Sequence, residues 1–275
     1  MTSLPQANSF DWSNLGRRIA SAAILIPSAL AGVHFGGVAF LLMLSVAVAL
    51  LSLEWGAMSA PAAPVRVAAA VGSTILLAMF LGQRAHMYWA WSALAAGSLT
   101  AALVARGVAE RPVNAAYGVV YIGVTGVCLV WLRAMPQGEG WTLMLLAITW
   151  AADISAFAFG NLFKGPKLWP RFSPNKTWSG FVGGLVAAMA TGAAMSTLPW
   201  FSLNLYAAIL VGLAGGLATM GGDLWESALK RRFGVKDSGD LIPGHGGLLD
   251  RVDGLLFAAV VIAAARMVNH LGWGH

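Results

Sequence analysis

The sequence has few charged residues and a single cysteine. Only 10% of its 275 residues are Asp, Glu, Lys or Arg, whereas a soluble domain contains about 25%. This shortage, together with a hydrophobic content of 58% and a mean hydropathy of +0.73, excludes an ordinary water-soluble enzyme. The lone Cys128 excludes an intrachain disulfide and a cysteine metal cluster. Its place in an apolar run is typical of a small buried hydrophobic residue.

Long apolar runs recur along most of the chain, each close to the roughly 20 residues that a helix needs to cross a bilayer. Charges, prolines and glycines separate them and predict about nine membrane-spanning helices. The predicted spans are 18–35, 36–59, 65–82, 86–105, 113–133, 140–161, 178–198, 203–225 and 254–271. We therefore predict an all-α fold, a polytopic transmembrane helical bundle in a single integral membrane domain. Its N-terminal spans occupy 18–135, and its C-terminal half, 136–275, carries two polar loops, 162–177 and 226–253.

The positive charge of the chain is explained by membrane topology. Seventeen Lys and Arg against eleven Asp and Glu give a net charge of +6. In a soluble protein this excess suggests a nucleic-acid ligand, but in a membrane protein basic residues gather in cytoplasmic loops. With nine spans and a cytoplasmic N-terminus, fourteen of the 17 Lys and Arg fall in cytoplasmic segments. We therefore predict a cytoplasmic N-terminus and expect no nucleic-acid partner.

The first span admits two alternatives. Pro27 and the pair Gly36-Gly37 leave a short run that also suits a re-entrant hairpin. Arg17 and Arg18, followed by an apolar run, also suit a signal peptide. Removing one of the first two spans would export both arginines against the charge bias, and further spans follow at once. A full first crossing is the interpretation we adopt.

Acidic residues are concentrated in the C-terminal half. Six of the eleven carboxylates fall within 223–253, and Asp153 lies in the apolar stretch WAADI. Ionisable groups at membrane depth are costly and usually mark a functional cavity. Helical spacing of i, i+3, i+4 and i+7 places four polar residues on one face: Asp223, Glu226, Ser227 and Lys230. Asp250 and Asp253, three positions apart, share a helix face at the start of the last span.

Between these segments the chain reads KDSGDLIPGHGGLLDRVDG, with glycines on both sides of His245. Such glycines permit tight turns that present N–H groups to phosphate oxygens. Two carboxylate-rich segments without cysteine suit a hard cation such as Mg²⁺, which takes one or two carboxylates plus substrate phosphates. Four basic residues supply charge for a polyphosphate: Lys230, Arg231, Lys236 and Arg251. The combination predicts phosphoryl or nucleotidyl transfer.

The other polar loop, 162–177, is basic, and its charges would attract anionic lipid headgroups and a nucleoside triphosphate alike. Three of its basic residues are equally typical of any cytoplasmic loop: Lys164, Lys167 and Arg171. Lys176 is the stronger candidate because SPNKTW directly precedes a span. We expect Ser173, Asn175, Lys176 and Thr177 at a helix start, where free N–H groups bind anions.

The segment from Ser227 to Asp253 resembles the signature of the CDP-diacylglycerol synthase (phosphatidate cytidylyltransferase) family. The shared pattern is S-x-L-K-R, four residues, K-D-x-G, then P-G-H-G-G-L-x-D-R-V-D. WAADISAFAFG and SPNKTWSG also resemble family segments, although Asn175 and Ser179 depart from the more frequent S-P-K-K-T-W-E-G. The N-terminal half is similar to the family by hydropathy alone.

The resemblance implies a Mg²⁺-dependent nucleotidyltransferase of phospholipid synthesis that converts CTP and phosphatidic acid into CDP-diacylglycerol and pyrophosphate. It implies metal ligation by Asp223 and Asp250, a homodimer, and a monovalent cation such as K⁺ beside the Mg²⁺. We expect a bacterial-type inner membrane with the active site on the cytoplasmic side. CTP must come to the membrane there, because each buried CH₂ of the lipid contributes about 0.8 kcal/mol to its retention.

The predicted roles of the side chains follow from charge. The phosphate of phosphatidic acid is already ionised near pH 7, so its attack on CTP requires charge neutralisation and alignment rather than a strong base. We predict catalytic roles for Asp223, Asp250, Lys230, Lys236 and Asp237. We predict substrate contacts from Lys176, Thr177, Ser227, Arg231, His245, Arg251 and Asp153. Asp153, Asp237 and Asp253 are expected to support the metal ligands. His245 is expected to organise its loop or to donate a hydrogen bond to phosphate. Glu226 is a weaker candidate for the site.

Three other functions remain as alternatives. A CDP-alcohol phosphotransferase-type enzyme would carry D-G-x-x-A-R and end in D-x-x-x-D, but Asp250 and Asp253 are three apart. A cation-coupled transporter would use Asp153 and Asp223 at mid-membrane, yet most acids lie in one loop region and no pair of interrupted spans repeats. A Ser-His-Asp hydrolase built from Ser227, His245 and Asp250 lacks a nucleophile elbow.

Overall fold

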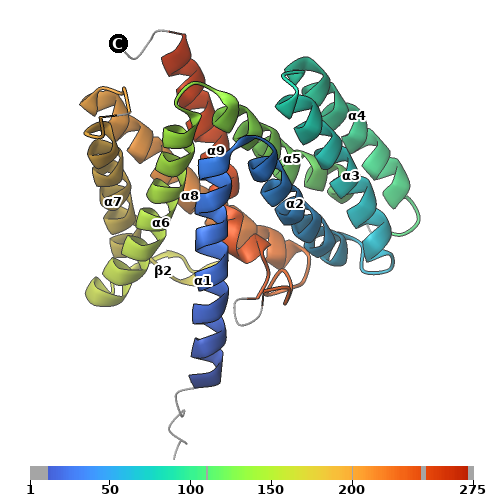
Figure 1. The fold of residues 1–275 in the computed structure, drawn as a ribbon. Coiled ribbons are helices and arrows are strands. Elements are labelled where there is room, and N and C mark those ends of the chain that lie inside the picture. Colours follow the sequence, from blue (N-terminus) through green and yellow to red (C-terminus); the bar gives the residue numbers. More distant parts are fainter. Residues whose placement is uncertain (1–11, 110, 200, 243–245, 272–275) are drawn as a thin grey trace, which may run out of the picture.

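The computed structural model describes residues 12–109, 111–199, 201–242 and 246–271. In this part the chain forms nine α-helices and one short β-hairpin (Figure 1). The helices are α1 (Trp12–Phe35), α2 (Gly37–Ser59), α3 (Pro64–Gln83), α4 (Met87–Ala105), α5 (Val113–Ala134), α6 (Gly138–Phe163), α7 (Trp178–Ser196), α8 (Leu205–Arg232) and α9 (Leu249–His270). The strands are β1 (Lys167–Trp169) and β2 (Ser173–Thr177). Helices α2 to α9 are long and apolar enough to cross a membrane, so the prediction of a polytopic helical bundle is confirmed.

The first predicted span coincides with α1, a continuous helix with Pro27 inside it. Its described apolar part, Ser21–Phe35, is shorter than the eight long spans. Gly36 and Gly37 have φ values of +60° and +49°, in the left-handed region that glycine adopts without a steric penalty. The turn expected at this glycine pair is therefore confirmed, whereas a full crossing by α1 stays a prediction.

The segment 226–253, predicted as a polar loop, is partly helical. Helix α8 continues to Arg232 and α9 begins at Leu249, so the connection is only 233–248. The prediction was wrong here because hydropathy measures burial in lipid, while a helix continues through polar residues that share one of its faces. The helical spacing predicted for Asp223 to Lys230, and for Asp250 with Asp253, is confirmed.

The loop 162–177 contains the β-hairpin, which the sequence analysis did not predict. Strand β1 pairs antiparallel with β2, with Lys167 opposite Thr177. Lys176 therefore lies in a strand and not at a helix start. Thr177 alone takes the predicted place: it caps α7, and its Oγ1 accepts from the Gly180 N–H at 3.2 Å. The Trp178 N–H donates to the Pro166 carbonyl at 3.0 Å, which fastens the hairpin to the start of α7.

The helices pack in two groups. Helices α2 to α5 supply most of one core, which includes Trp55, Ile75 and Ile122 and to which α8 and α9 contribute. Helices α6 to α9 supply most of the other, which includes Trp141 and Ile148 and to which α1, α2 and α5 contribute. Helix α9 packs on α8 and α6 of one group and on α5 of the other. In Figure 1 the α6–α7 pair and the α2–α4 group stand on opposite sides of the bundle, with the hairpin toward its lower end. The two groups are thus joined through α9.

Glycines allow α8 and α9 to approach closely. A Cβ added to Gly222 would lie 2.5 Å from the Asp253 carbonyl oxygen and 3.1 Å from the Gly254 Cα. Small residues at a membrane helix crossing permit this backbone contact. Because Asp223 follows Gly222 and Asp253 precedes Gly254, the crossing brings both carboxylates to the same cavity.

Candidate active site

A cavity of about 950 Å³ lies among α6, α7, α8, α9 and the β-hairpin. Four aspartates line it: Asp153, Asp223, Asp250 and Asp253. Four basic residues line it as well: Lys164, Lys167, Lys176 and Arg251. Apolar side chains complete the wall, among them Phe157 of α6 and Phe181 of α7. The cavity therefore combines charges of both signs with an apolar wall, within a bundle of membrane-spanning helices.

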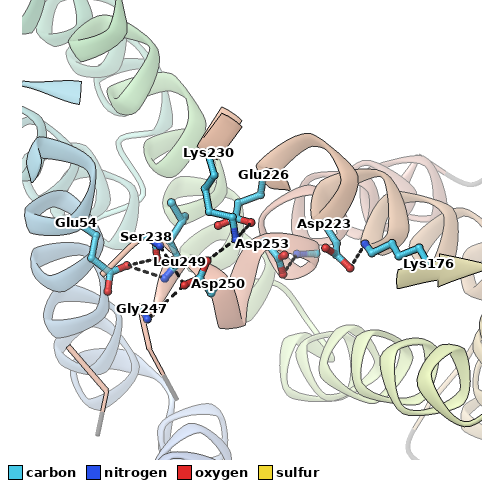
Figure 2. A network of polar contacts seen from close by, with 11 residues as sticks. Glu54, Lys176, Asp223, Glu226, Lys230, Ser238, Gly247, Leu249, Asp250 and Asp253 are labelled. Atoms are coloured by element: carbon cyan, nitrogen blue, oxygen red, sulfur yellow. Dashed lines mark hydrogen bonds and ion pairs between the residues drawn. The ribbon is translucent and has the colours of Figure 1, made fainter. Parts of the chain in front are cut away.

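Lys176 links the hairpin to α8. Its ammonium forms an ion pair with Asp223, and the two side chains are 27% and 34% exposed. Figure 2 shows this pair reaching from β2 to α8. Both groups are open enough for a ligand in the cavity to contact them.

Lys230 is held between two carboxylates that are less exposed to solvent than Asp223. Its Nζ lies 2.5 Å from Asp250 Oδ1 and 2.7 Å from Glu226 Oε2 (Figure 2). The side chains of Lys230, Asp250 and Glu226 are only 15%, 11% and 1% exposed. Buried charges are tolerated only when they are paired. This ion-paired trio therefore fixes the side of Asp250 that faces α8.

The second carboxylate oxygen of Asp250 is held by the connection 233–248. Asp250 Oδ2 accepts from the Ser238 N–H at 3.1 Å and from the Gly247 N–H at 3.3 Å. Gly246, directly before this donor, has φ +82°. The positive-φ turn expected in the glycine-rich segment is confirmed at Gly246, and it brings backbone donors to the carboxylate of Asp250.

The donor chemistry of the cavity fits a hard divalent cation. The described residues that line it offer carboxylate oxygens and neither cysteine nor histidine ligands. Within the described ranges, no three Asp, Glu, His or Cys side chains converge on one point. Such a site suits Mg²⁺, which keeps several waters and binds through one or two carboxylates plus substrate phosphates.

The model of the cytidylyltransferase family matches residues 16–268. The chain belongs to the cytidylyltransferase family. The family match extends from α1 to the last turns of α9, so it includes every element that lines the cavity.

Several bacterial relatives in this family carry the name phosphatidate cytidylyltransferase. The protein from Brucella abortus (strain 2308) is 45% identical over 148 residues, which is 54% of each chain. The one from Staphylococcus aureus (strain COL) is 42% identical over 141 residues, 50% of this chain and 53% of the relative. The one from Staphylococcus haemolyticus is 39% identical over 145 residues, 52% of this chain and 56% of the relative. The chain thus spans about half the length of the curated relatives it matches.

The structure gathers about half of the predicted site residues at the cavity. The predicted residues that line it are Asp153, Lys176, Thr177, Asp223, Asp250 and Arg251. Lys230 contacts the cavity indirectly, through Asp250. Four others are not among the described lining residues: Ser227, Arg231, Lys236 and Asp237. The last three are exposed, and the predicted His245 lies outside the described residues.

Two basic residues that the sequence did not single out lie at the cavity. Lys164 and Lys167 were indistinguishable from ordinary charges of a cytoplasmic loop, yet both line the cavity. Lys167 reaches it because β1 pairs with β2, which sets Lys167 opposite Thr177, the N-cap residue of α7. Sequence alone gives no signal for this placement, because the hairpin that creates it is too short to leave a pattern.

Glu54 of α2 is the residue that sequence reasoning missed. Its side chain is buried, with 2% of the residue exposed, and it accepts from the backbone N–H groups of Leu248 and Leu249 at 2.6 and 2.7 Å. The Ser238 hydroxyl donates to the same carboxylate at 3.3 Å. A signal did exist: Glu54 is a lone acid in an apolar span, which is the pattern that singled out Asp153.

Proposed function

We propose that this protein is a phosphatidate cytidylyltransferase, which transfers CMP from CTP to phosphatidic acid and yields CDP-diacylglycerol and pyrophosphate. The cavity carries the proposal, since it holds four carboxylates, four basic residues and an apolar wall in a membrane bundle of the cytidylyltransferase family. The name phosphatidate cytidylyltransferase, which the bacterial relatives carry, supports the same activity.

The reaction joins two polyanions. An oxygen of the lipid phosphate forms a bond to the α-phosphorus of CTP, and the bond from that phosphorus to the pyrophosphate oxygen breaks. Like charges oppose this approach, so the site must neutralise them and align the attack. Lys164, Lys167, Lys176 and Arg251 supply positive charge around the cavity, and lysine and arginine are strong phosphate binders.

Asp223 and Asp250 would hold Mg²⁺ at this cavity, where the ion would neutralise phosphate charge and polarise the reacting phosphoryl group. The chain's own residues prepare this site. Lys230 and the Ser238 N–H fix the two oxygens of Asp250. Lys176 keeps a positive charge beside Asp223. We also propose, on the family resemblance, a monovalent cation such as K⁺ beside the Mg²⁺.

The apolar side chains near the cavity suit a substrate that stays in the bilayer. Ile154 and Phe157 of α6 are 69% and 75% exposed, and Trp178 and Val182 of α7 are 50% and 54% exposed. A lipid lying along α6 and α7 can present its phosphate to the cavity without extracting its chains. We propose a bacterial-type inner membrane, a cavity on the cytoplasmic side where CTP is found, and a homodimer as the working unit.

The proposal is tested with the purified protein in phosphatidate-containing vesicles and CTP labelled at the α-phosphate. With Mg²⁺ present, we expect the label to enter the lipid fraction and pyrophosphate to form in equal amount. Vesicles with diacylglycerol in place of phosphatidate are the matched control and should stay unlabelled. Absence of CTP consumption by folded protein would exclude the proposed activity. Release of CMP from CDP-diacylglycerol and a free alcohol would instead identify a phosphotransferase.

A further inference from the structure

Glu54 connects two parts of the molecule that are far apart in the sequence. It lies near the end of α2, yet its hydrogen-bond partners are at the start of α9, 194 and 195 positions later. Leu248 N–H donates to Oε1, Leu249 N–H donates to Oε2, and the Ser238 hydroxyl donates to Oε2 as well. Figure 2 shows the contacts from Ser238 and Leu249 converging on the Glu54 carboxylate.

The contact has a clear electrostatic basis. The first N–H groups of a helix have no intrahelical acceptor, and the helix dipole favours negative charge at that end. In α9 the N-cap residue, Leu248, has no side chain that can accept them. The Glu54 carboxylate of α2 accepts these hydrogen bonds instead and so caps α9. A buried carboxylate and an uncapped helix start thereby satisfy each other.

Ser238 joins this cap to Asp250. Its hydroxyl donates to Glu54 at 3.3 Å, while its backbone N–H donates to Asp250 Oδ2 at 3.1 Å. Ser238 is 3% exposed. The neighbouring Gly239 is packed so tightly that an added Cβ would lie 3.2 Å from Glu54 Cγ. Any movement of Glu54 therefore moves the residue that orients Asp250.

We propose that Glu54 is a positioning residue of the active site: it fixes the start of α9 and the connection 233–248, and through them the carboxylate of Asp250. This inference rests on the proposed function in one respect, namely that Asp250 faces the metal and substrate. Partners that orient a metal-binding carboxylate typically affect metal affinity or activity by about 10- to 100-fold when they are removed.

Glu54→Gln in the full-length protein tests the proposal. The amide keeps the size of the side chain but has a single acceptor oxygen, and its NH₂ group faces a backbone donor. We expect hydrogen exchange at the Leu248 and Leu249 amides to accelerate by on the order of tenfold, as for the loss of one hydrogen bond. We expect the affinity for Mn²⁺, measured by electron paramagnetic resonance without substrates, to fall by about 10- to 100-fold. The Mg²⁺ concentration for half-maximal activity should rise in parallel.

Ser52→Ala is the matched control, because Ser52 is also a buried polar residue of α2 but lies against Gly72 of α3. It should leave exchange and metal affinity at their wild-type values. Ser238→Ala removes one donor to Glu54 without leaving an amide in its place, and it should reproduce part of the effect if Glu54→Gln fails to fold.

A purely structural role would reduce the amount of folded protein and leave the metal affinity of the remainder unchanged, which would overturn the proposal. Unchanged exchange at Leu248 and Leu249 would overturn it as well. If the wild-type protein fails to form CDP-diacylglycerol, the proposed function fails. The exchange and Mn²⁺ measurements need no turnover, so they still decide the role of Glu54.

Discussion

At the scale of the residue, the ammonium group of Lys230 is shared by two carboxylates that have little access to water. Replacing it with an uncharged side chain leaves Glu226 and Asp250 facing each other without a cation. Removal of one partner from a buried ion pair costs about 3 to 5 kcal/mol. We therefore expect Lys230→Met to lower the free energy of unfolding by about 3 kcal/mol, measured by thermal unfolding in detergent.

A second substitution shows how much of the stability lost in Lys230→Met is due to uncompensated charge and how much to packing. Glu226→Gln added to Lys230→Met removes one of the two uncompensated charges, so the double variant should recover part of the lost stability. Equal melting temperatures for Lys230→Met and the wild type would show that the ion-paired trio contributes nothing to the fold.

The two proposed metal ligands give a second prediction at this scale. Asp223→Asn and Asp250→Asn keep side-chain size but remove the charge that would bind the metal. We expect each to reduce turnover by about 100-fold or more, because charge stabilisation by a metal ion is worth several kcal/mol, measured as lipid labelled from CTP per amount of folded protein. Asp223→Asn should keep a melting temperature close to wild type, whereas Asp250→Asn also removes a partner of the buried Lys230 and should lower it. Asp240→Asn is the control, because Asp240 is an exposed carboxylate of the connection 233–248, and it should retain full activity. Near-normal turnover in either variant would remove that residue from the metal site.

Single residues were predictable where their surroundings made them unusual. Asp153 and Asp223 stand out because a carboxylate in an apolar run is costly. Glu54 obeys the same rule, but its role was invisible because its partners lie more than 180 positions away and two of the three are backbone groups. Lys236 and Asp237 match the family signature, yet they are exposed on the connection, and their roles stay predictions.

At the scale of the element, the crossing of α8 and α9 sets the relative positions of the carboxylates. A Cβ at Gly222 would meet the backbone of Asp253 and Gly254, so Gly222→Ala must push the helices apart. Overpacking of this kind costs about 1 to 3 kcal/mol, and misplacement of catalytic groups by about 1 Å can cost 100-fold in rate. We expect a large loss of turnover in the folded variant, measured by the lipid-labelling assay.

The chain offers a matched control one residue earlier. A Cβ at Gly221 has no neighbour within 4 Å, so Gly221→Ala should be active. Equal rates for the two alanine variants would mean that the close approach of α8 and α9 does not determine the geometry of the site.

Helices and the hairpin differ in how well the sequence predicts them. A membrane requires about 20 apolar residues per crossing, and this requirement locates α2 to α7 within a few residues. The hairpin is polar and only eight residues long in its two strands, Lys167–Trp169 and Ser173–Thr177. Its pairing depends on docking against α7, which no local pattern encodes, and so the strand position of Lys176 was not predicted.

At the scale of the whole molecule, the distribution of basic residues predicts that the hairpin end of the bundle faces the cytoplasm. The turn between α3 and α4 lies at the other end (Figure 1). Cysteine labelling tests this topology in a Cys128→Ala background. A membrane-impermeant thiol reagent added to intact bacterial cells should label His86→Cys and not Pro170→Cys, and both should react after permeabilisation. The reverse pattern would place the cavity on the outer side.

The proposed function requires that the cavity among α6, α7, α8, α9 and the hairpin bind both the metal and CTP. The most direct test is an experimental structure of the protein in lipid with Mn²⁺ and CTP, in which the metal is located by its anomalous scattering. We predict Mn²⁺ ligated by Asp223 and Asp250, with the triphosphate beside it and in contact with Lys176. Metal and nucleotide bound outside this cavity, or a metal that neither carboxylate ligates, would show that this cavity is not the active site.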